Sequence, residues 1–156
     1  MFLIWLQFLL TFITLAAVSL TSAANGAGPA ALKPVQDILK PVAAPLAGII
    51  GTLAIIGFIW GLYQLVGEFF ALFTGYFSFS FAIAIVTTLV LIVLSVLAGY
   101  ISVAAFFGAP ASGAGKFVDG IKRAFGSVEA ILGLVGLVLA LWLLIEFILN
   151  RSGVYI

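Results

Sequence analysis

Apolar residues gather in four long stretches along the chain, with short polar or small-residue segments between them. The stretches are Phe2–Leu20, about Val42–Phe73, about Phe77–Phe107 and about Val128–Asn150. Each is longer than the roughly 18 residues that mark a membrane-spanning helix. Backbone N–H and C=O groups in an apolar medium must be satisfied within their own segment, so helix is the expected state. The pattern therefore predicts an all-α fold of four long hydrophobic helices.

The two middle stretches are longer than a simple membrane span requires. About thirty helical residues extend roughly 45 Å at a rise of 1.5 Å per residue, whereas the hydrocarbon core of a bilayer is about 30 Å thick. Tilt absorbs part of the excess. Alternatively, these helices pack mainly against other subunits, in a shell whose thickness is not set by lipid.

Two connectors of small residues, Ser22–Ala31 and Gly108–Gly115, contain the Gly and Pro that are typical of turns. Each connector leads into a short basic segment, Lys33–Lys40 or Lys116–Arg123. Each half of the chain thus has an apolar helix, a turn, a basic segment and a second apolar helix.

The halves also align residue by residue, with one single-residue slip. The aligned pairs include Ser19 with Ser102, Lys33 with Lys116, Lys40 with Arg123, Gly51 with Gly133 and Trp60 with Trp142. We expect a single domain over residues 1–156, made of two tandem helical hairpins at about 1–73 and 77–156. Coincidence in so biased a composition is the alternative.

Four antiparallel helices would place both basic segments at the same end of the bundle. The predicted basic face consists of Lys33, Lys40, Lys116, Lys122 and Arg123. Asp37 and Asp119 partly offset its charge, and the opposite end carries Glu68, Glu146 and Arg151. In a membrane, these cations anchor helix ends at lipid headgroups on the cytoplasmic side. In a closed particle they face packaged DNA, because phosphate neutralisation adds up over many copies.

Composition narrows the possible chemistry. The 156 residues are 65% hydrophobic and 7% charged, with a net charge of +1, and a soluble domain of this size could not cover its surface with so few charges. The chain has no His and no Cys, which excludes imidazole catalysis, thiolate nucleophiles and the usual zinc sites. We predict that the protein is not an enzyme and has no catalytic, cofactor-binding or metal-binding residues.

Glycines on the apolar stretches are candidates for close helix packing. Gly57 and Gly61 form a GxxxG pattern, which lets two helices approach closely in a membrane. The full set of predicted helix-packing residues is Gly48, Gly51, Gly57, Gly61, Gly133 and Gly136.

Glu68 and Glu146 are acids deep within apolar stretches, where ionisable residues are functional suspects. Both lie close to predicted helix ends, so we favour interfacial solvation or pairing with Arg151 over a proton or ion site.

The first stretch resembles a signal peptide in length, and residues 21–24 resemble a cleavage site. Residues 1–7, however, contain no Lys or Arg, which a secretory signal normally carries. We expect this helix to be retained.

The whole pattern resembles the small, very hydrophobic coat proteins of spindle-shaped archaeal viruses, whose helical hairpins build a flexible shell or tail. The resemblance is architectural and covers the entire chain: two apolar hairpins, basic connectors and no catalytic residues. It implies a structural virion subunit whose partners are many copies of itself, with lipid, or DNA through the basic face, as further partners and no small-molecule substrate.

Two alternatives stay open. Conjugative and DNA-import pilins are apolar hairpins with a lysine-bearing turn that faces the lumen, and they resemble the chain in its basic connectors; this would make it part of an extracellular filament. The other alternative is a solitary four-helix integral membrane protein, such as a pore or an accessory factor.

Overall fold

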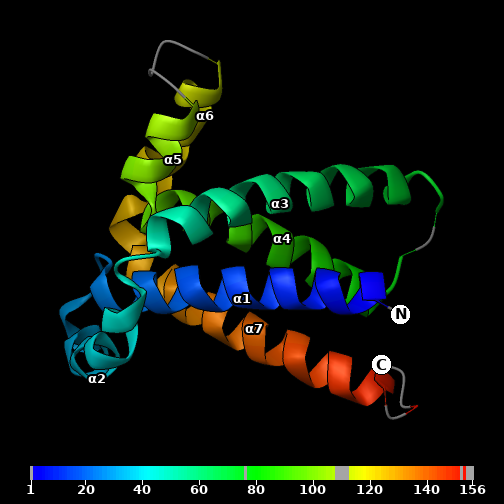
Figure 1. Cartoon of the computed structure of the whole chain (residues 1–156), viewed down its shortest axis with the longest axis horizontal. Coiled ribbons are helices and arrows are strands. Elements are labelled where there is room, and N and C mark those ends of the chain that lie inside the picture. The colour runs from blue at the N-terminus through cyan, green and yellow to red at the C-terminus, as the bar shows by residue number, and fades with distance from the viewer. Residues whose placement is uncertain (1, 76, 108–112, 152, 154–156) are drawn as a thin grey trace.

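The computed structural model describes residues 2–75, 77–107, 113–151 and 153. All regular structure in these residues is helical, which confirms the predicted all-α fold. The four long helices are α1 (Phe2–Asn25), α3 (Ile50–Leu72), α4 (Phe79–Ala98) and α7 (Glu129–Arg151). They lie side by side with alternating direction (Figure 1). In the described residues, four helical segments, including these helices, are long and apolar enough to cross a membrane, which indicates membrane association.

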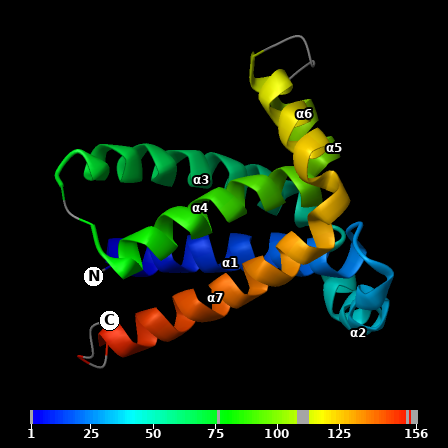
Figure 2. The same ribbon diagram turned by 180° about the vertical axis from the view of Figure 1, so that it is seen from behind.

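Three shorter helices lie at one end of this bundle. They are α2 (Lys33–Ala43), α5 (Tyr100–Phe107) and α6 (Gly113–Phe125). The first lies across the end of the bundle, and α5 and α6 turn away from the bundle axis together (Figures 1 and 2). Short 3-10 turns at Ala30–Leu32, Ala44–Leu46 and Gly126–Val128 complete the connections. The described start of the chain, the end of α3, the start of α4 and the end of α7 lie at the opposite end.

The long middle stretches of the sequence are divided between spanning helices and connectors. The third stretch bends at Gly99, which has φ −121° and ψ 36° and separates α4 from α5. A Cβ atom at Gly99 would collide with that of Ala54 on α3, so the bend coincides with a close helix crossing. The first residues of the second stretch form the end of α2 and the turn that precedes α3. The resulting helices of 20 to 24 residues extend about 30–36 Å, close to the thickness of a bilayer core.

The helices pair across the two halves of the chain. The most extensive contacts join α1 to α7 and α3 to α4. In each case the first apolar helix of one half packs along the last helix of the other half. Contacts within a half, α1 with α3 and α4 with α7, are smaller, as is the contact of α1 with α4. Two hairpins related by a twofold axis along the bundle would pack in this way; that the halves arose by duplication stays a prediction.

The core lies where the four long helices cross. Its largest fully buried side chains include Leu15, Phe58, Leu91 and Leu94. Small hydroxyl residues are buried beside them, among them Thr14, Ser19, Ser22 and Ser95. Small and hydroxyl side chains are typical of helix contacts in membranes, since they allow the backbones to approach closely.

Candidate functional site: a charged bundle end, glycine seams and a polar cavity

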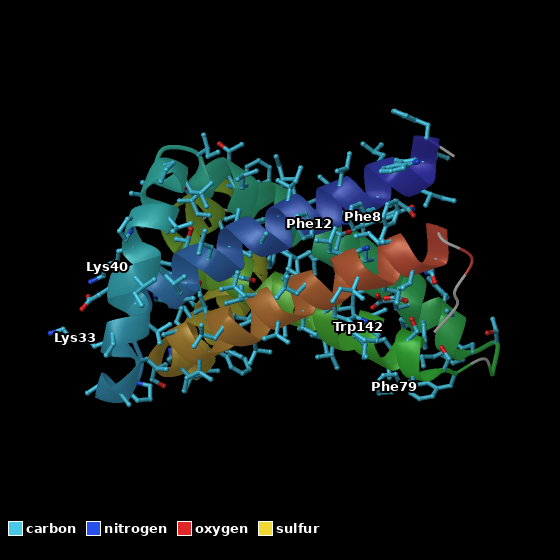
Figure 3. All side chains as sticks on the ribbon, turned by 90° about the horizontal axis from the view of Figure 1, so that it is seen from below. Phe8, Phe12, Lys33, Lys40, Phe79 and Trp142 are labelled. Carbon is cyan, nitrogen blue, oxygen red and sulfur yellow. The ribbon has the colours of Figure 1, made fainter. Side chains whose placement is uncertain are left out.

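Helix α2 has three distinct faces. Lys33, Asp37 and Lys40 follow one another at helical spacing, and Lys40 Nζ lies 3.9 Å from Asp37 Oδ1. Figure 3 shows Lys33 and Lys40 pointing away from the bundle. Leu39 and Ala43 lie on the face that is turned towards the bundle, where Ala43 is buried.

An apolar stripe on α2 lies nearly opposite the charged face. It consists of Val35, Ile38 and Val42, and Ile38 is 72% exposed. Gln36 Nε2 donates a hydrogen bond of 2.7 Å to the carbonyl of Gly26 and so fixes α2 to the end of α1. A helix with cations on one side and an uncovered apolar stripe on the other suits the surface of a lipid layer.

Helix α6 carries the second group of predicted cations in a different setting. Val118 and Ile121, which align with Val35 and Ile38, are buried in the core. The Tyr100 hydroxyl of α5 donates a hydrogen bond to Asp119, and this bond raises the pKa of Tyr100 above its ordinary value. The positions equivalent to Val35 and Ile38 are thus covered on α6, whereas Val35 and Ile38 themselves are uncovered on α2.

Lys122 on α6 interacts mainly with its own chain. Its Nζ lies 3.9 Å from Glu129 Oε1 and 5.6 Å from the centre of the Tyr100 ring. The structure therefore adds Glu129 to the acids at this end. Five cations and three acids leave a formal charge of +2 there. The predicted basic residues do lie at one end of the bundle, but they are divided between two separate helices (Figure 1).

Three predicted glycines of α3 line its contacts with α4 and α5. A Cβ atom at Gly57 would lie 2.7 Å from Ser95 Oγ, and one at Gly61 would lie 2.6 Å from Ile92 Cγ1. At Gly51 it would collide with Ser102. The GxxxG pattern is therefore used inside the chain.

Gly133 and Gly136 line the contact between α7 and α1. A Cβ atom at Gly133 would lie 2.7 Å from the Ser19 carbonyl oxygen and 2.8 Å from Ala23 Cα. At Gly136 it would lie 2.7 Å from Leu94 Cδ1 and would collide with Ser19 Oγ. At Gly133 the contact is with backbone atoms, and a contact this close requires glycine.

Gly48 does not belong with these packing residues. It lies in the turn before α3, and nothing lies within 4 Å of a Cβ atom built there. The prediction that Gly48 is a helix-packing residue was therefore wrong. Its apolar neighbours in the sequence suggested a helix contact, but the residue lies outside the helices.

A polar cavity of about 290 Å³ opens between the four long helices, towards the end opposite α2. Its polar lining residues are Gln7, Thr11, Gln64, Glu68, Thr87, Thr88, Glu146 and Asn150. Phe8, Trp142 and Phe147 supply aromatic walls. The cavity thus brings together Glu68 and Glu146, the two acids that the sequence singled out. We had expected them to be solvated or paired with Arg151. The side chain of Arg151 lies outside the described atoms.

Hydrogen bonds hold the polar residues of this cavity in place. Thr11 Oγ1 accepts from Trp60 Nε1 at 2.8 Å and from Gln64 Nε2 at 3.2 Å. Thr88 Oγ1 donates to Glu68 Oε1 at 2.7 Å, and the Ser80 hydroxyl donates to Glu146. Sequence reasoning missed this gathering. The available signal was a repeated spacing of four residues: Gln7 and Thr11, Gln64 and Glu68, Glu146 and Asn150.

The described residues contain no group of three or more acidic or other metal-ligating side chains suited to a metal ion. Set beside the models of known protein families, the curated proteins and the solved structures, the chain matches none of them.

Proposed function

We propose that this protein is a structural subunit of a lipid-containing layer, of the kind that forms a virion envelope, and that it assembles with many copies of itself. The observation that carries the proposal is the apolar perimeter of the four-helix bundle. Large hydrophobic side chains are exposed on every long helix, among them Ile13, Ile59, Leu89 and Val138. Charged side chains are concentrated in α2 and α6 at one end.

The extent of the surface supports this proposal. The accessible area is 8675 Å², whereas a compact soluble protein of 16.3 kDa exposes about 7,500 Å². The apolar part of this surface needs lipid or protein to cover it. Because α1, α3, α4 and α7 all expose such residues, each subunit needs lipid or other subunits around its whole perimeter. The helix lengths match a bilayer better than a thick shell of protein.

The charge at the α2 and α6 end favours lipid headgroups over DNA as the partner of the basic face. Binding to nucleic acid gains with each phosphate that a cation neutralises. Here Asp37 and Glu129 lie beside Lys40 and Lys122, and the formal charge of +2 at this end gives each subunit little attraction for a nucleic acid. Lysines at helix ends anchor readily at a headgroup layer, where their stems stay in the apolar region.

Self-assembly can be tested by energy transfer between copies in a bilayer. The chain has no cysteine, so Phe77→Cys, at an exposed position, provides one labelling site for a donor or an acceptor dye. We expect transfer between copies to persist after tenfold dilution with lipid, and ordered arrays in electron micrographs at high protein content.

Transfer that falls to the value for randomly placed molecules would overturn the assembly proposal. Thin filaments without lipid would overturn the envelope setting in favour of a pilin.

The polar cavity favours the second candidate, a solitary membrane protein with a pore or accessory function. A monodisperse monomer together with ion flux through the same vesicles would establish that candidate instead.

A further inference from the structure

The polar cavity carries an inference that is independent of any assembly. We propose that the cavity between α1, α3, α4 and α7 binds a small organic cation with an ammonium group. This assigns a ligand-binding site to a chain whose perimeter points only to a structural role.

Charge is the first reason. Glu68 on α3 and Glu146 on α7 line the same cavity from different helices. Each accepts a hydrogen bond from one hydroxyl group, of Thr88 or Ser80. Neither carboxylate forms an ion pair with a described side chain. Two acidic side chains that line one cavity of an apolar bundle favour a positive ligand over a neutral or negative one.

Unpartnered atoms are the second reason. Glu68 Oε2 and Gln64 Oε1 are buried in the described structure without a hydrogen-bond partner. Both atoms are acceptors, so the ligand that satisfies them must donate N–H or O–H groups. Trp142 Nε1 is also unpartnered, but it is one neutral donor beside two carboxylates. The balance therefore favours a cationic donor.

The shape and lining of the cavity define the class of cation. A volume of about 290 Å³ accommodates an ammonium group with a short apolar chain. The rings of Phe8, Trp142 and Phe147 line the cavity and supply apolar contact. A bare metal ion such as Ca²⁺ prefers six or more oxygen ligands. The mixed aromatic and acidic lining suits an organic amine better.

Calorimetric titration of the full chain in a neutral detergent tests the proposal. The probes are butylammonium, butanol and butyrate, which share a chain length and differ in charge. We expect butylammonium to bind in a saturable manner and the other two not to bind. Equal binding of butanol would reduce the cavity to an apolar pocket and overturn the proposal, as would no binding of butylammonium at millimolar concentration.

Substitutions locate the site. Glu68→Gln and Glu146→Gln should each weaken butylammonium binding at least tenfold. Asp37→Asn removes the same charge from the exposed face of α2 and should leave binding unchanged. Arg151→Gln should leave binding unchanged or strengthen it; a loss of binding in this variant would overturn the proposed ligand set.

Circular dichroism checks that each variant is folded. Folded Glu68→Gln and Glu146→Gln variants that bind like the wild type would overturn the proposal. If one of them fails to fold, the other gives the same test from a different helix. The selectivity of the unmodified chain for the charged probe decides the matter if both fail. Copies that assemble without binding the amine would refute the cavity proposal alone.

Discussion

Replacing Gly133 with alanine should destabilise the bundle, although the change adds a single methyl group. The new Cβ atom would lie within 2.8 Å of both the Ser19 carbonyl oxygen and Ala23 Cα. These are backbone atoms, so a side-chain rotation cannot relieve the contact, and α1 and α7 must move apart. Overpacking of this kind costs about 1–3 kcal/mol. We expect a loss near the upper end of that range, because the obstacle is helical backbone in the most extensive contact of the fold.

Unfolding of the detergent-solubilised protein by SDS, followed by circular dichroism, measures this loss. Gly67→Ala is the matched control, because Gly67 is also helical and nothing lies within 4 Å of the position that its new methyl group would take. Alanine favours helix over glycine by up to about 1 kcal/mol, so the control should be neutral or stabilising. Equal effects at the two positions would show that α1 and α7 are not in close contact.

Replacing Phe58 with alanine should have a comparably large effect. Phe58 is 2% exposed, and its ring centre lies 5.0 Å from that of Phe107 on α5 and 6.2 Å from that of Phe117 on α6. Phe→Ala substitutions in protein cores cost about 3–5 kcal/mol. We expect a cost near the low end of this range in a membrane. The unfolded helices stay in lipid there, so the substitution removes mainly packing contacts.

Phe69→Ala on the same helix is the control for this prediction. Phe69 is 55% exposed, so its removal should change the free energy of unfolding by less than about 1 kcal/mol, as substitutions at surface positions usually do. The same SDS titration gives both values. A Phe58→Ala variant as stable as the Phe69→Ala variant would mean that α5 and α6 are not anchored on α3.

The sequence was sufficient to predict the all-α fold, because apolar stretches of spanning length leave the backbone few other states. It did not predict where the long stretches end. Phe77–Phe107 looks continuous, yet it bends at Gly99, because α3 approaches there too closely for a Cβ atom. The chain has 17 glycines, and the sequence does not indicate which of them lies at such a helix crossing.

The hydrophobic pattern also did not predict that the helices pair across the two halves of the chain. Leu, Ile and Val side chains occur on every face of the long helices, so the pattern does not distinguish the face that meets α7 from the face that meets α3. Contacts of Gly133 with Ser19 and of Gly51 with Ser102 are the discriminating features. Each involves aligned residues of the two halves, but the sequence shows the alignment and not the exchange of partners.

The candidate site was predicted in part. The basic residues lie at one end of the bundle, as the order of the helices required. Glu68 and Glu146 were recognised as unusual, but their common cavity was not, because the neutral residues around them gave no signal one at a time. Gln7 and Thr11 on α1 indicate a polar cavity only when the same one-turn spacing of polar residues is recognised on α3 and α7.

Membrane topology is the direct test of the four-span arrangement that all these proposals share. Single-cysteine variants Lys33→Cys, Lys116→Cys and Phe77→Cys can be labelled in sealed vesicles of uniform orientation with a maleimide that does not cross the membrane. Cysteines at 33 and 116 should be labelled from the same side of the membrane, and the cysteine at 77 from the opposite side only. Labelling of positions 33 and 116 from opposite sides, or of all three from one side, would contradict the arrangement.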